Sequence, residues 1–300
     1  MYELRFTSDA ADFLSAAADH LAQRPVLSTV VATIADRAVR EDAEGIERDP
    51  DRPWWFVTVE DHDHRLVGEA MRTGPGPHHA VWVQDLPEEA AVQLARALHE
   101  RGEFTSAVNG TIPAARLMAD EVARLWGEAS AIRTHTRLYQ LGALATPTGV
   151  PGRLRRAGTD DLELMNHWLS IFDTEAAKQG GRPMPTRTDE HDRQETARRI
   201  QAGRLWIWED QGRPVHVTGI NLPSFGVGRI GPVLTPAEHR GHGYASAAVA
   251  GVSQHLLDLG VQACLFTDQA NPVSNKVYQR IGYRPVADMA EFSISRHEVG

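Results

Sequence analysis

A glycine-rich segment in the second half of the chain has the residue types that hold a phosphate group. It reads Arg240-Gly241-His242-Gly243-Tyr244-Ala245 and lies between an expected strand and an expected amphipathic helix. Glycines let the backbone approach a ligand closely and adopt a positive φ. The unpaired N–H groups and the dipole at a helix start attract anions. The segment therefore predicts a pyrophosphate site to which Arg240 adds one charge. The alternative is a glycine-rich connection without a ligand.

A second set of polar residues follows at helical spacing. Asn271, Ser274 and Tyr278 are three and four positions apart, so they share one face of a helix that begins after Asn271-Pro272 and is closed by Gly282. A tyrosine on such a face can serve as a general acid. The alternative is a tyrosine that fills space in the core.

These residues also resemble a known family. Arg240-x-x-Gly243-x-Ala245 matches the Q/R-x-x-G-x-G/A signature of the GCN5-related N-acetyltransferase (GNAT) superfamily, whose members use acyl-CoA. The segment Asn271-x-x-Ser274-x-x-x-Tyr278-x-x-x-Gly282-Tyr283 resembles the second motif of that family, at the expected distance. The resemblance covers about Leu154–Ser295. Residues 275–286 look especially like bacterial GNAT proteins that carry a weaker GNAT-like N-terminal half.

The resemblance implies a role for each matching position. Backbone groups of Val233, Leu234 and Thr235 are expected to pair with the pantetheine arm of acetyl-CoA or another acyl-CoA, as an added strand would. The pyrophosphate is expected on the segment Arg240, Gly241, His242, Gly243, Tyr244 and Ala245. Asn271 and Ser274 are expected along the pantetheine. Tyr278 matches the tyrosine that often protonates the departing thiolate.

Acyl transfer to an amine also needs a base or a water chain that removes a proton. Glu175, Glu209 and Glu238 are candidates because they flank the expected groove, and each has the alternative of a solvated surface carboxylate. Glu175 is preferred as the second catalytic residue because it ends a helix beside a Gly- and Pro-rich loop, where this family commonly builds its acceptor site. On that helix, Trp168 and Phe172 either line the acceptor pocket or pack in the core.

Composition limits the remaining possibilities. Of the 300 residues, 42% are hydrophobic and 24% charged, which disfavours a disordered chain or a coiled coil. The net charge of −9 disfavours a nucleic-acid binder. Apolar runs are too short to cross a membrane, and the first residues do not resemble a signal peptide. Cys264 is the single cysteine, so no intrachain disulfide can form, and a cytoplasmic location is expected.

The length suggests two domains. The uncharged, Pro- and Gly-rich segment 143–152 is typical of a linker. We therefore expect a degenerate GNAT-like domain at 1–142 and a catalytic GNAT domain at 153–300. Helical and strand patterns occur in both halves, which is typical of an α+β chain. The resemblance implies the GNAT fold, which is an α/β (α+β) fold with a mixed central sheet flanked by helices, here in two tandem GNAT-like lobes. The first half lacks the phosphate signature, and Trp54, Trp55 and Trp82 are its candidate core.

Two other patterns are set aside. Residues 226–231 match GxGxxG, but the following residues are strand-like and include Pro232, so a bend or bulge is favoured over a dinucleotide site. His62, His64, His78 and His79 lie in polar, turn-like segments without zinc-ligand spacing, so no metal is expected.

The sequence thus favours a cytoplasmic enzyme that transfers acetyl from acetyl-CoA to a primary amine on a small molecule or peptide. It predicts no nucleic-acid or membrane partner and leaves a homodimer open. One alternative is a non-catalytic module that binds or senses acyl-CoA. Another is an interaction protein that retains only the fold. A tandem enzyme like mycothiol synthase is a narrower variant of the first interpretation. The acceptor is not specified by the residues.

Overall fold

The computed structural model describes residues 2–46, 54–73, 80–179 and 189–295. The chain divides into two compact units. Unit 1 comprises Met1–Leu138 and Val286–Gly300, and unit 2 comprises Tyr139–Pro285. The segment expected as a linker lies within unit 2, and the residues after Pro285 group with unit 1. None of the described helices combines the length and apolar character needed to span a membrane.

Unit 1 is built on a mixed sheet with the strand order β1-β2-β3-β4-β5-β12-β6. Its strands are β1 (Glu3–Thr7), β2 (Trp55–Glu60), β3 (Leu66–Arg72), β4 (Val81–Gln84) and β5 (Ala107–Thr111), with parts of β6 (Ala129–Leu141) and β12 (Tyr283–Ser295). Its helices are α1 (Ala10–Gln23), α2 (Thr29–Ala43), α3 (Glu88–Glu100) and α4 (Ala114–Trp126). Asp9 begins α1 by accepting hydrogen bonds from the amides of Ala11 and Asp12.

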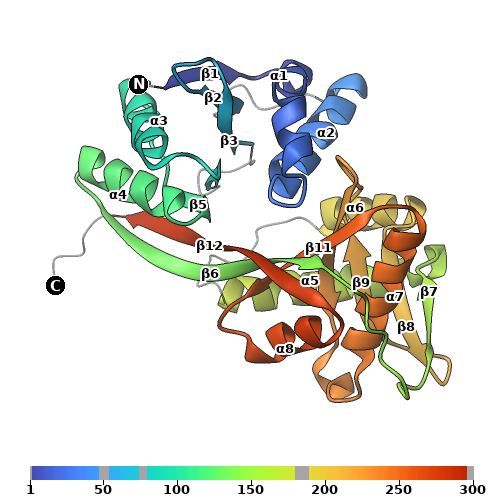
Figure 1. The fold of residues 1–300 in the computed structure, drawn as a ribbon. Coiled ribbons are helices and arrows are strands. Elements are labelled where there is room, and N and C mark those ends of the chain that lie inside the picture. The colour runs from blue at the N-terminus through green and yellow to red at the C-terminus, as the bar shows by residue number, and fades with distance from the viewer. Residues whose placement is uncertain (1, 47–53, 74–79, 180–188, 296–300) are drawn as a thin grey trace. The chain divides into compact units, whose positions relative to one another are not determined.

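Helices cover both faces of this sheet. In Figure 1, α3 and α4 lie on one side of the unit 1 strands, and α1 and α2 lie on the other. The α3 and α4 side holds a large apolar core in which Trp55 is 3% exposed. On the opposite side, Phe13 of α1 stacks on Phe56 with ring centroids 4.7 Å apart. Trp54 and Trp82 are only partly buried, so of the three tryptophans expected in the core, Trp55 alone is there.

Unit 2 has the strand order β6-β11-β10-β9-β8-β7. Its elements are β7 (Arg153–Arg156), α5 (Leu162–Gln179), α6 (Asp189–Gln201), β8 (Leu205–Asp210), β9 (Arg213–Ile220), β10 (Val227–Leu234), α7 (Tyr244–Asp258), β11 (Gln262–Asp268) and α8 (Pro272–Arg280). Neighbouring strands from β7 to β10 are antiparallel, whereas β10 and β11 run parallel. The fold is therefore mixed α/β with a mostly antiparallel sheet, as the sequence predicts.

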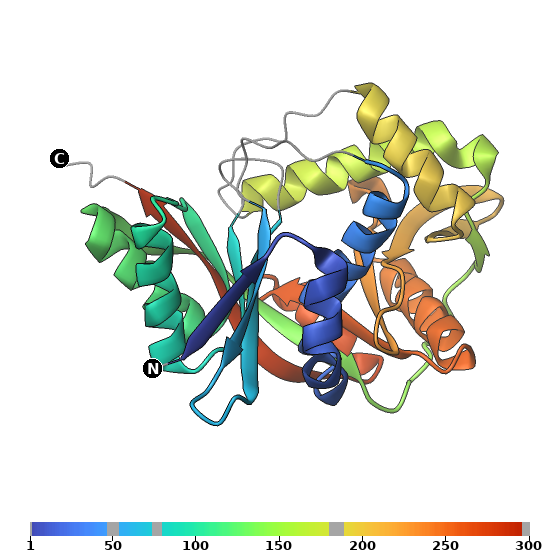
Figure 2. The same ribbon diagram turned by 90° about the horizontal axis from the view of Figure 1, so that it is seen from above.

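Two helical layers enclose the unit 2 sheet. One apolar cluster joins residues of α5 and α6 to one face and includes Met165, Trp168, Val217 and Leu234. A second cluster joins α7 and α8 to the other face and includes Ile230. Figure 2, seen from above, shows α5 and α6 on one side of these strands and α7 on the other. The alternation of side chains along β9 and β10 thus decides which residues face α7.

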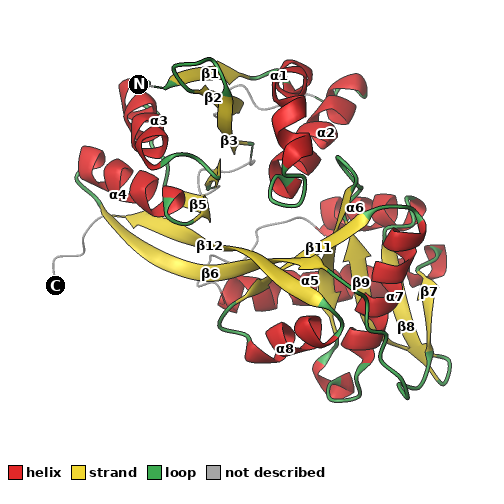
Figure 3. Cartoon of the chain, viewed as in Figure 1, coloured by secondary structure: helices red, strands yellow, loops and turns green. Residues whose placement is uncertain are grey.

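Strands β6 and β12 are neighbours in the sheet, and the boundary between the units falls inside both of them. Figure 3 shows them as long arrows. Within unit 1, β12 pairs antiparallel with β5, for example Ala290 with Gly110. This long-range pairing draws the end of the chain into unit 1. A domain assignment based on composition cannot detect such a pairing.

The uncharged segment after β6 is held against the end of α8. Gly142 N donates to the carbonyl of Gly282 and Ala145 N donates to that of Ile281, each at 3.0 Å. Gly282 has a φ of +105°, and a Cβ there would overlap the carbonyl oxygen of Ala143. Only glycine fits this close approach of two backbones.

We expect Gly282→Ala to lower the midpoint of thermal unfolding by more than ~5 °C, because the methyl group forces the two segments apart. The matched control is Gly260→Ala, since Gly260 also has a left-handed φ (+71°) but open space around it. Calorimetry or circular dichroism of both variants measures the difference. Equal midpoints for the two variants would contradict the packing described here.

Candidate functional site

Helix α7 begins in the glycine-rich segment and presents unpaired amides. Gly243 is its N-cap, with a φ of 83°, and no side chain caps the helix. Gly241 has a φ of 87°. The first hydrogen bond into the helix from this segment is Ala247 N to Gly243 O, at 3.1 Å. Within the described chain, the amides of residues 241–246 therefore donate to no group. The predicted phosphate-binding residues form a helix N-terminus that is open to an anion.

The strand that leads into this loop separates from its parallel neighbour. Pairing of β10 with β11 ends at Ile230↔Leu265, whereas pairing with β9 continues to Val233↔Thr218 and Leu234↔Val217. The register with β9 shifts between Ile230 and Val233, which confirms the bend or bulge expected over the GxGxxG pattern. Beyond Ile230, the edge of β10 that faces β11 has no strand partner among the described residues. Val233, Leu234 and Thr235 lie on this stretch of chain.

The structure brings Arg240 and Glu175 together. Arg240 donates from Nη2 to Oε1 and Oε2 of Glu175, at 2.9 and 3.0 Å, and from Nε to the carbonyl of Thr235, at 2.9 Å. Both charged side chains are about half exposed, 52% and 51%. The expected phosphate arginine and the expected base are therefore one ion pair, which ties the last turns of α5 to the end of β10.

Helix α8 carries the second predicted set. Asn271 caps the helix by accepting a hydrogen bond from Ser274 N at 3.0 Å. Tyr278 is 7% exposed, and burial raises the pKa of its hydroxyl to about 12. Among the described residues, that hydroxyl has no hydrogen-bond partner. Tyr278 is thus a buried phenol that stays protonated at neutral pH and keeps its proton available to a ligand.

Tyr278 belongs to the same apolar cluster as Ile230 and Leu265, the last paired residues before β10 and β11 separate. Its ring lies edge-on to Tyr283, with centroids 6.2 Å apart. Tyr283 is 2.7 Å from Ser253 Oγ, and Ser253 itself donates to the carbonyl of Val249. The Tyr283 hydroxyl is therefore used as a donor inside the core, unlike that of Tyr278.

The other candidate carboxylates are poorly suited to act as a base. Glu209 accepts from Arg153 at 2.9 Å and from Arg155 at 3.3 Å, and these guanidinium groups lower the pKa of its carboxyl. Glu238 is exposed in a short 3₁₀ turn. Trp168 is 6% exposed inside the α5 and α6 core, and Phe172 packs against the same cluster. The core role considered for Trp168 and Phe172 is therefore the one observed.

Sequence reasoning missed His216. It is fully buried on β9, and its two ring nitrogens lie 2.7 Å from Thr235 Oγ1 and 2.6 Å from Thr218 Oγ1. Burial lowers the pKa of its imidazole to about 3, so the ring is neutral. The one available signal was a histidine inside an otherwise apolar strand pattern, Val215-His216-Val217. Tyr244 also makes a further contact, since its hydroxyl donates to Asp210 at 2.7 Å.

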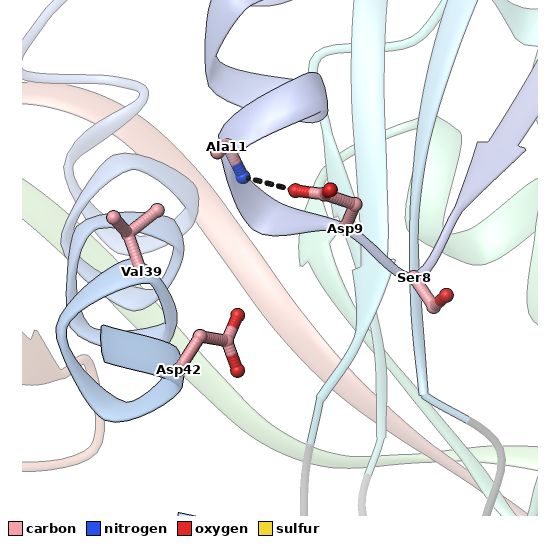
Figure 4. Close-up of a pocket in the computed structure, with 5 residues that line it drawn as sticks. All are labelled: Ser8, Asp9, Ala11, Val39 and Asp42. Carbon is pink, nitrogen blue, oxygen red and sulfur yellow. Dashed lines mark hydrogen bonds between the residues drawn. The ribbon is translucent and has the colours of Figure 1, made fainter. Parts of the chain in front are cut away.

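Unit 1 has a hollow of about 530 Å³ between the ends of α1 and α2, lined by Ser8, Asp9, Ala11, Val39 and Asp42 (Figure 4). The Asp9 carboxylate caps α1 and accepts a hydrogen bond of 2.8 Å from Ala11 N. Among the described residues, two carboxylates and no cationic side chain line this hollow, so these residues would repel an anionic cofactor.

One group of possible metal ligands lies among the described residues. Glu3, Glu60 and His64 place one ligand atom each within 4.8 Å of one another at the surface of unit 1. Arg5 pairs with Glu60 at 3.8 Å, which supplies part of the compensating charge. His62 is well exposed, whereas His78 and His79 lie outside the described residues. Cys264 is fully buried on β11, as expected of a small core residue.

Comparisons with known proteins identify the fold. Residues 165–283 match the sequence model described as "Acetyltransferase (GNAT) family". Among curated proteins, none matches this chain. A solved structure of a Drosophila protein is similar with a TM-score of 0.66 and 14% identity, over 97% of this chain and 98% of that one.

Two further solved structures carry informative names. A GCN5-related N-acetyltransferase from Sphaerobacter thermophilus has a TM-score of 0.59 and 16% identity, over 97% of this chain and 94% of that one. A tandem GNAT protein from the clavulanic acid biosynthesis pathway has a TM-score of 0.56 and 16% identity, over 98% of both chains. At these identities the structures show the fold alone, a fold that supports acyl transfer in general. Residues 165–283 are therefore a domain of the GNAT acetyltransferase family, within a chain that has the tandem GNAT fold over nearly its whole length.

Proposed function

We propose that the chain is an acyl-CoA-dependent N-acyltransferase that moves acetyl from acetyl-CoA to a primary amine, at the site in unit 2. One observation carries the proposal: β10 leaves β11 after Ile230, on the strand that leads directly to the unpaired amides of residues 241–246. An unpaired strand edge suits an extended, amide-containing arm, and a helix N-terminus suits the pyrophosphate attached to it. Acyl-CoA combines both groups in one molecule.

The residues present fit each part of that substrate. The amides of Gly241 to Ala245 hold the pyrophosphate, and the backbone of Val233 to Thr235 pairs with the pantetheine. Asn271 and Ser274 lie along the pantetheine. In the reaction, the neutral amine attacks the thioester carbonyl and the N–C bond forms. The nitrogen loses its extra proton to a base or a water chain, the C–S bond breaks, and Tyr278 protonates the departing sulfur. Tyr278 suits this role because its buried hydroxyl is protonated and has no partner within the described chain.

Glu175 stays a prediction as the base. Its two carboxylate oxygens accept from Arg240 in this structure, so it can take a proton from the amine only if that ion pair opens. Arg240 would then be free to approach a phosphate. Opening of this one ion pair would thus free Glu175 to act as a base and Arg240 to bind phosphate. In the Glu175→Gln variant, a lower kcat reports on the role as base, whereas a changed Kd for acetyl-CoA reports on phosphate binding.

Substituting Gly243→Glu tests the phosphate loop. We expect the Kd for acetyl-CoA to rise at least ~100-fold, because the new carboxylate repels the pyrophosphate and its side chain fills the approach to the amides. Isothermal titration calorimetry measures the change. The control is Gly260→Glu at the far end of α7, which has a similar left-handed φ and open surroundings. Undiminished affinity in Gly243→Glu would remove the loop from the binding site.

Substituting Tyr278→Phe tests the general acid. We expect kcat to fall at least tenfold with an unchanged Kd for CoA, because general acid catalysis typically contributes ~10²–10⁴ in rate. Stopped assays of CoA release over a panel of amines provide the readout. Tyr283→Phe is the control in the same cluster, and its kcat should stay within threefold. An unchanged kcat in Tyr278→Phe rules out the acid role.

The raised pKa of Tyr278 sets the expected pH profile. A phenol is protonated below its pKa, so with a value of about 12 the acid form is lost only as the pH rises through 12. The amine must lose its proton to react, so kcat/KM should rise with pH and show no falling limb up to ~10. A falling limb near pH 10, the usual range of tyrosine, that disappears in Tyr278→Phe would mean that the phenol is solvated during turnover.

Two alternatives make different predictions. A module that only binds or senses acyl-CoA would bind CoA tightly and release no thiol with any amine. An interaction protein that keeps only the fold would show no thermal shift with acetyl-CoA. The catalytic proposal is preferred because Tyr278 is a buried phenol whose hydroxyl has no partner among the described residues, in the same cluster as the residues where the strands separate. Such a group has no evident use in a purely structural protein.

A further inference from the structure

Three polar side chains form a row on one face of the unit 2 sheet. His216 and Thr218 are two residues apart on β9, so they lie on the same face of the sheet. Thr235, the third, directly follows Leu234 of β10, which pairs with Val217. Val217 and Leu234 belong to the α5 and α6 core, so His216 and Thr218 point to the opposite face, which α7 covers. This is the helix whose first turn presents the unpaired amides. The row therefore lies on the face where the phosphate loop begins.

The positions of the protons in this row follow from burial. His216 and Thr218 are both 0% exposed, and the neutral ring of His216 has one N–H donor and one bare nitrogen. Among the described residues, the one hydrogen-bond partner of the Thr218 hydroxyl is Nε2 of His216. If Nε2 carried the proton, the Thr218 hydroxyl would accept it and leave its own hydrogen unpaired in the core. A buried donor without an acceptor is costly.

The opposite arrangement satisfies every buried group. The Thr218 hydroxyl then donates to Nε2, and the proton on Nδ1 donates to Thr235 Oγ1 at 2.7 Å. Thr235 accepts this hydrogen bond, so its own hydroxyl proton is available to another group. Thr235 is only partly buried, and its carbonyl is held by Arg240 Nε at 2.9 Å. Both ends of this residue are thus fixed, and the hydroxyl is left as a donor.

We propose that Thr235 donates this hydroxyl proton to a phosphoryl oxygen of bound acyl-CoA, and that His216, with Thr218 behind it, is the positioning residue that orients it. The inference rests on the proposed function of unit 2 and adds to it a side-chain donor beside the backbone amides. A phosphate oxygen can only accept a hydrogen bond, so it requires the Thr235 hydroxyl to donate. The hydrogen bond from His216 already sets the hydroxyl in that orientation.

The tautomer of His216 is the first test, and it needs no ligand. Nitrogen-15 NMR of the histidine ring distinguishes a protonated Nδ1 from a protonated Nε2. We expect Nδ1–H in the ligand-free protein across pH 6–8. In Thr218→Val, which removes the donor to Nε2, we expect a mixture of the two forms. A protonated Nε2 in the unaltered protein overturns the inference, whatever the protein binds.

Affinity for CoA is the second test. Thr235→Val should raise the Kd for CoA at least tenfold, whereas Thr235→Ser, which keeps the hydroxyl, should stay within threefold. Thr196→Val is the matched control, because Thr196 is a buried threonine on α6 whose hydroxyl donates to Asp192 and Asn166. Its Kd should not change. A Thr235→Val variant that binds CoA within threefold of the unaltered protein overturns the inference.

Coupling between the two residues is the third test. His216→Leu should raise the Kd for CoA about threefold, since the freed hydroxyl then samples its staggered positions, but it should have no effect when Thr235→Val is already present. An equal effect in both backgrounds means that His216 acts only on stability, which contradicts the positioning role.

If His216→Leu does not fold, the tautomer and Thr235 measurements still decide. If the unaltered protein binds no CoA, the proposed function fails together with the phosphate contact, and the NMR result separates that outcome from a wrong tautomer.

Discussion

The requirement that every backbone N–H and C=O find a partner governs the functional half of this protein. Strands β9 and β10 satisfy one another as far as Leu234, but β10 and β11 stop pairing at Ile230. The chain then enters a helix whose first amides also lack acceptors among the described residues. Such groups are normally paired with protein or water. Here two sets of them adjoin along one stretch of chain, from the end of β10 to the start of α7. Gly241 and Gly243 leave two positions next to the helix start without a side chain.

This arrangement is how an acidic chain would accept the anionic substrate proposed above. The net charge of −9 gives no general attraction for phosphate. Local dipoles act over a few ångströms, where they outweigh the screened field of distant carboxylates. Arg240 is the nearest formal positive charge in the loop, and Glu175 already neutralises it. The loop therefore depends on oriented backbone groups more than on side-chain charge, and glycine at Gly241 and Gly243 matters more than the arginine between the strand and the helix.

The glycine-rich loop and the helix that carries Tyr278 could be predicted from the sequence, because the residue patterns that indicate them are local. Glycine spacing, the Asn271-Pro272 helix start and the three-and-four spacing up to Tyr278 each depend on a few neighbouring residues. The predicted helices around these signals are present. Three strands are not apparent from the residue pattern alone: Glu3–Thr7, Ala107–Thr111 and Arg153–Arg156. They are short, and residues such as Asn109 and Gly110 disfavour a strand by themselves. Pairing with neighbouring strands decides their conformation: β1 pairs with β2, β5 with β4 and β12, and β7 with β8. The contacts of Glu175 and His216 were unpredictable for the same reason, since each depends on residues from a separate element.

The last strand has a consequence for how the protein is made. Residues of β12 complete the sheet of unit 1 by pairing with β5, yet they are the final described residues of the chain. During synthesis, β5 therefore remains an edge strand, with one row of its backbone groups unsatisfied, until all of unit 2 has been translated. Domains usually fold in order from the N-terminus during synthesis, but unit 1 cannot complete its sheet before unit 2 has been made. The sheet of unit 1 is completed only after unit 2 has left the ribosome, so a chain truncated before β12 leaves unit 1 with an exposed, aggregation-prone edge.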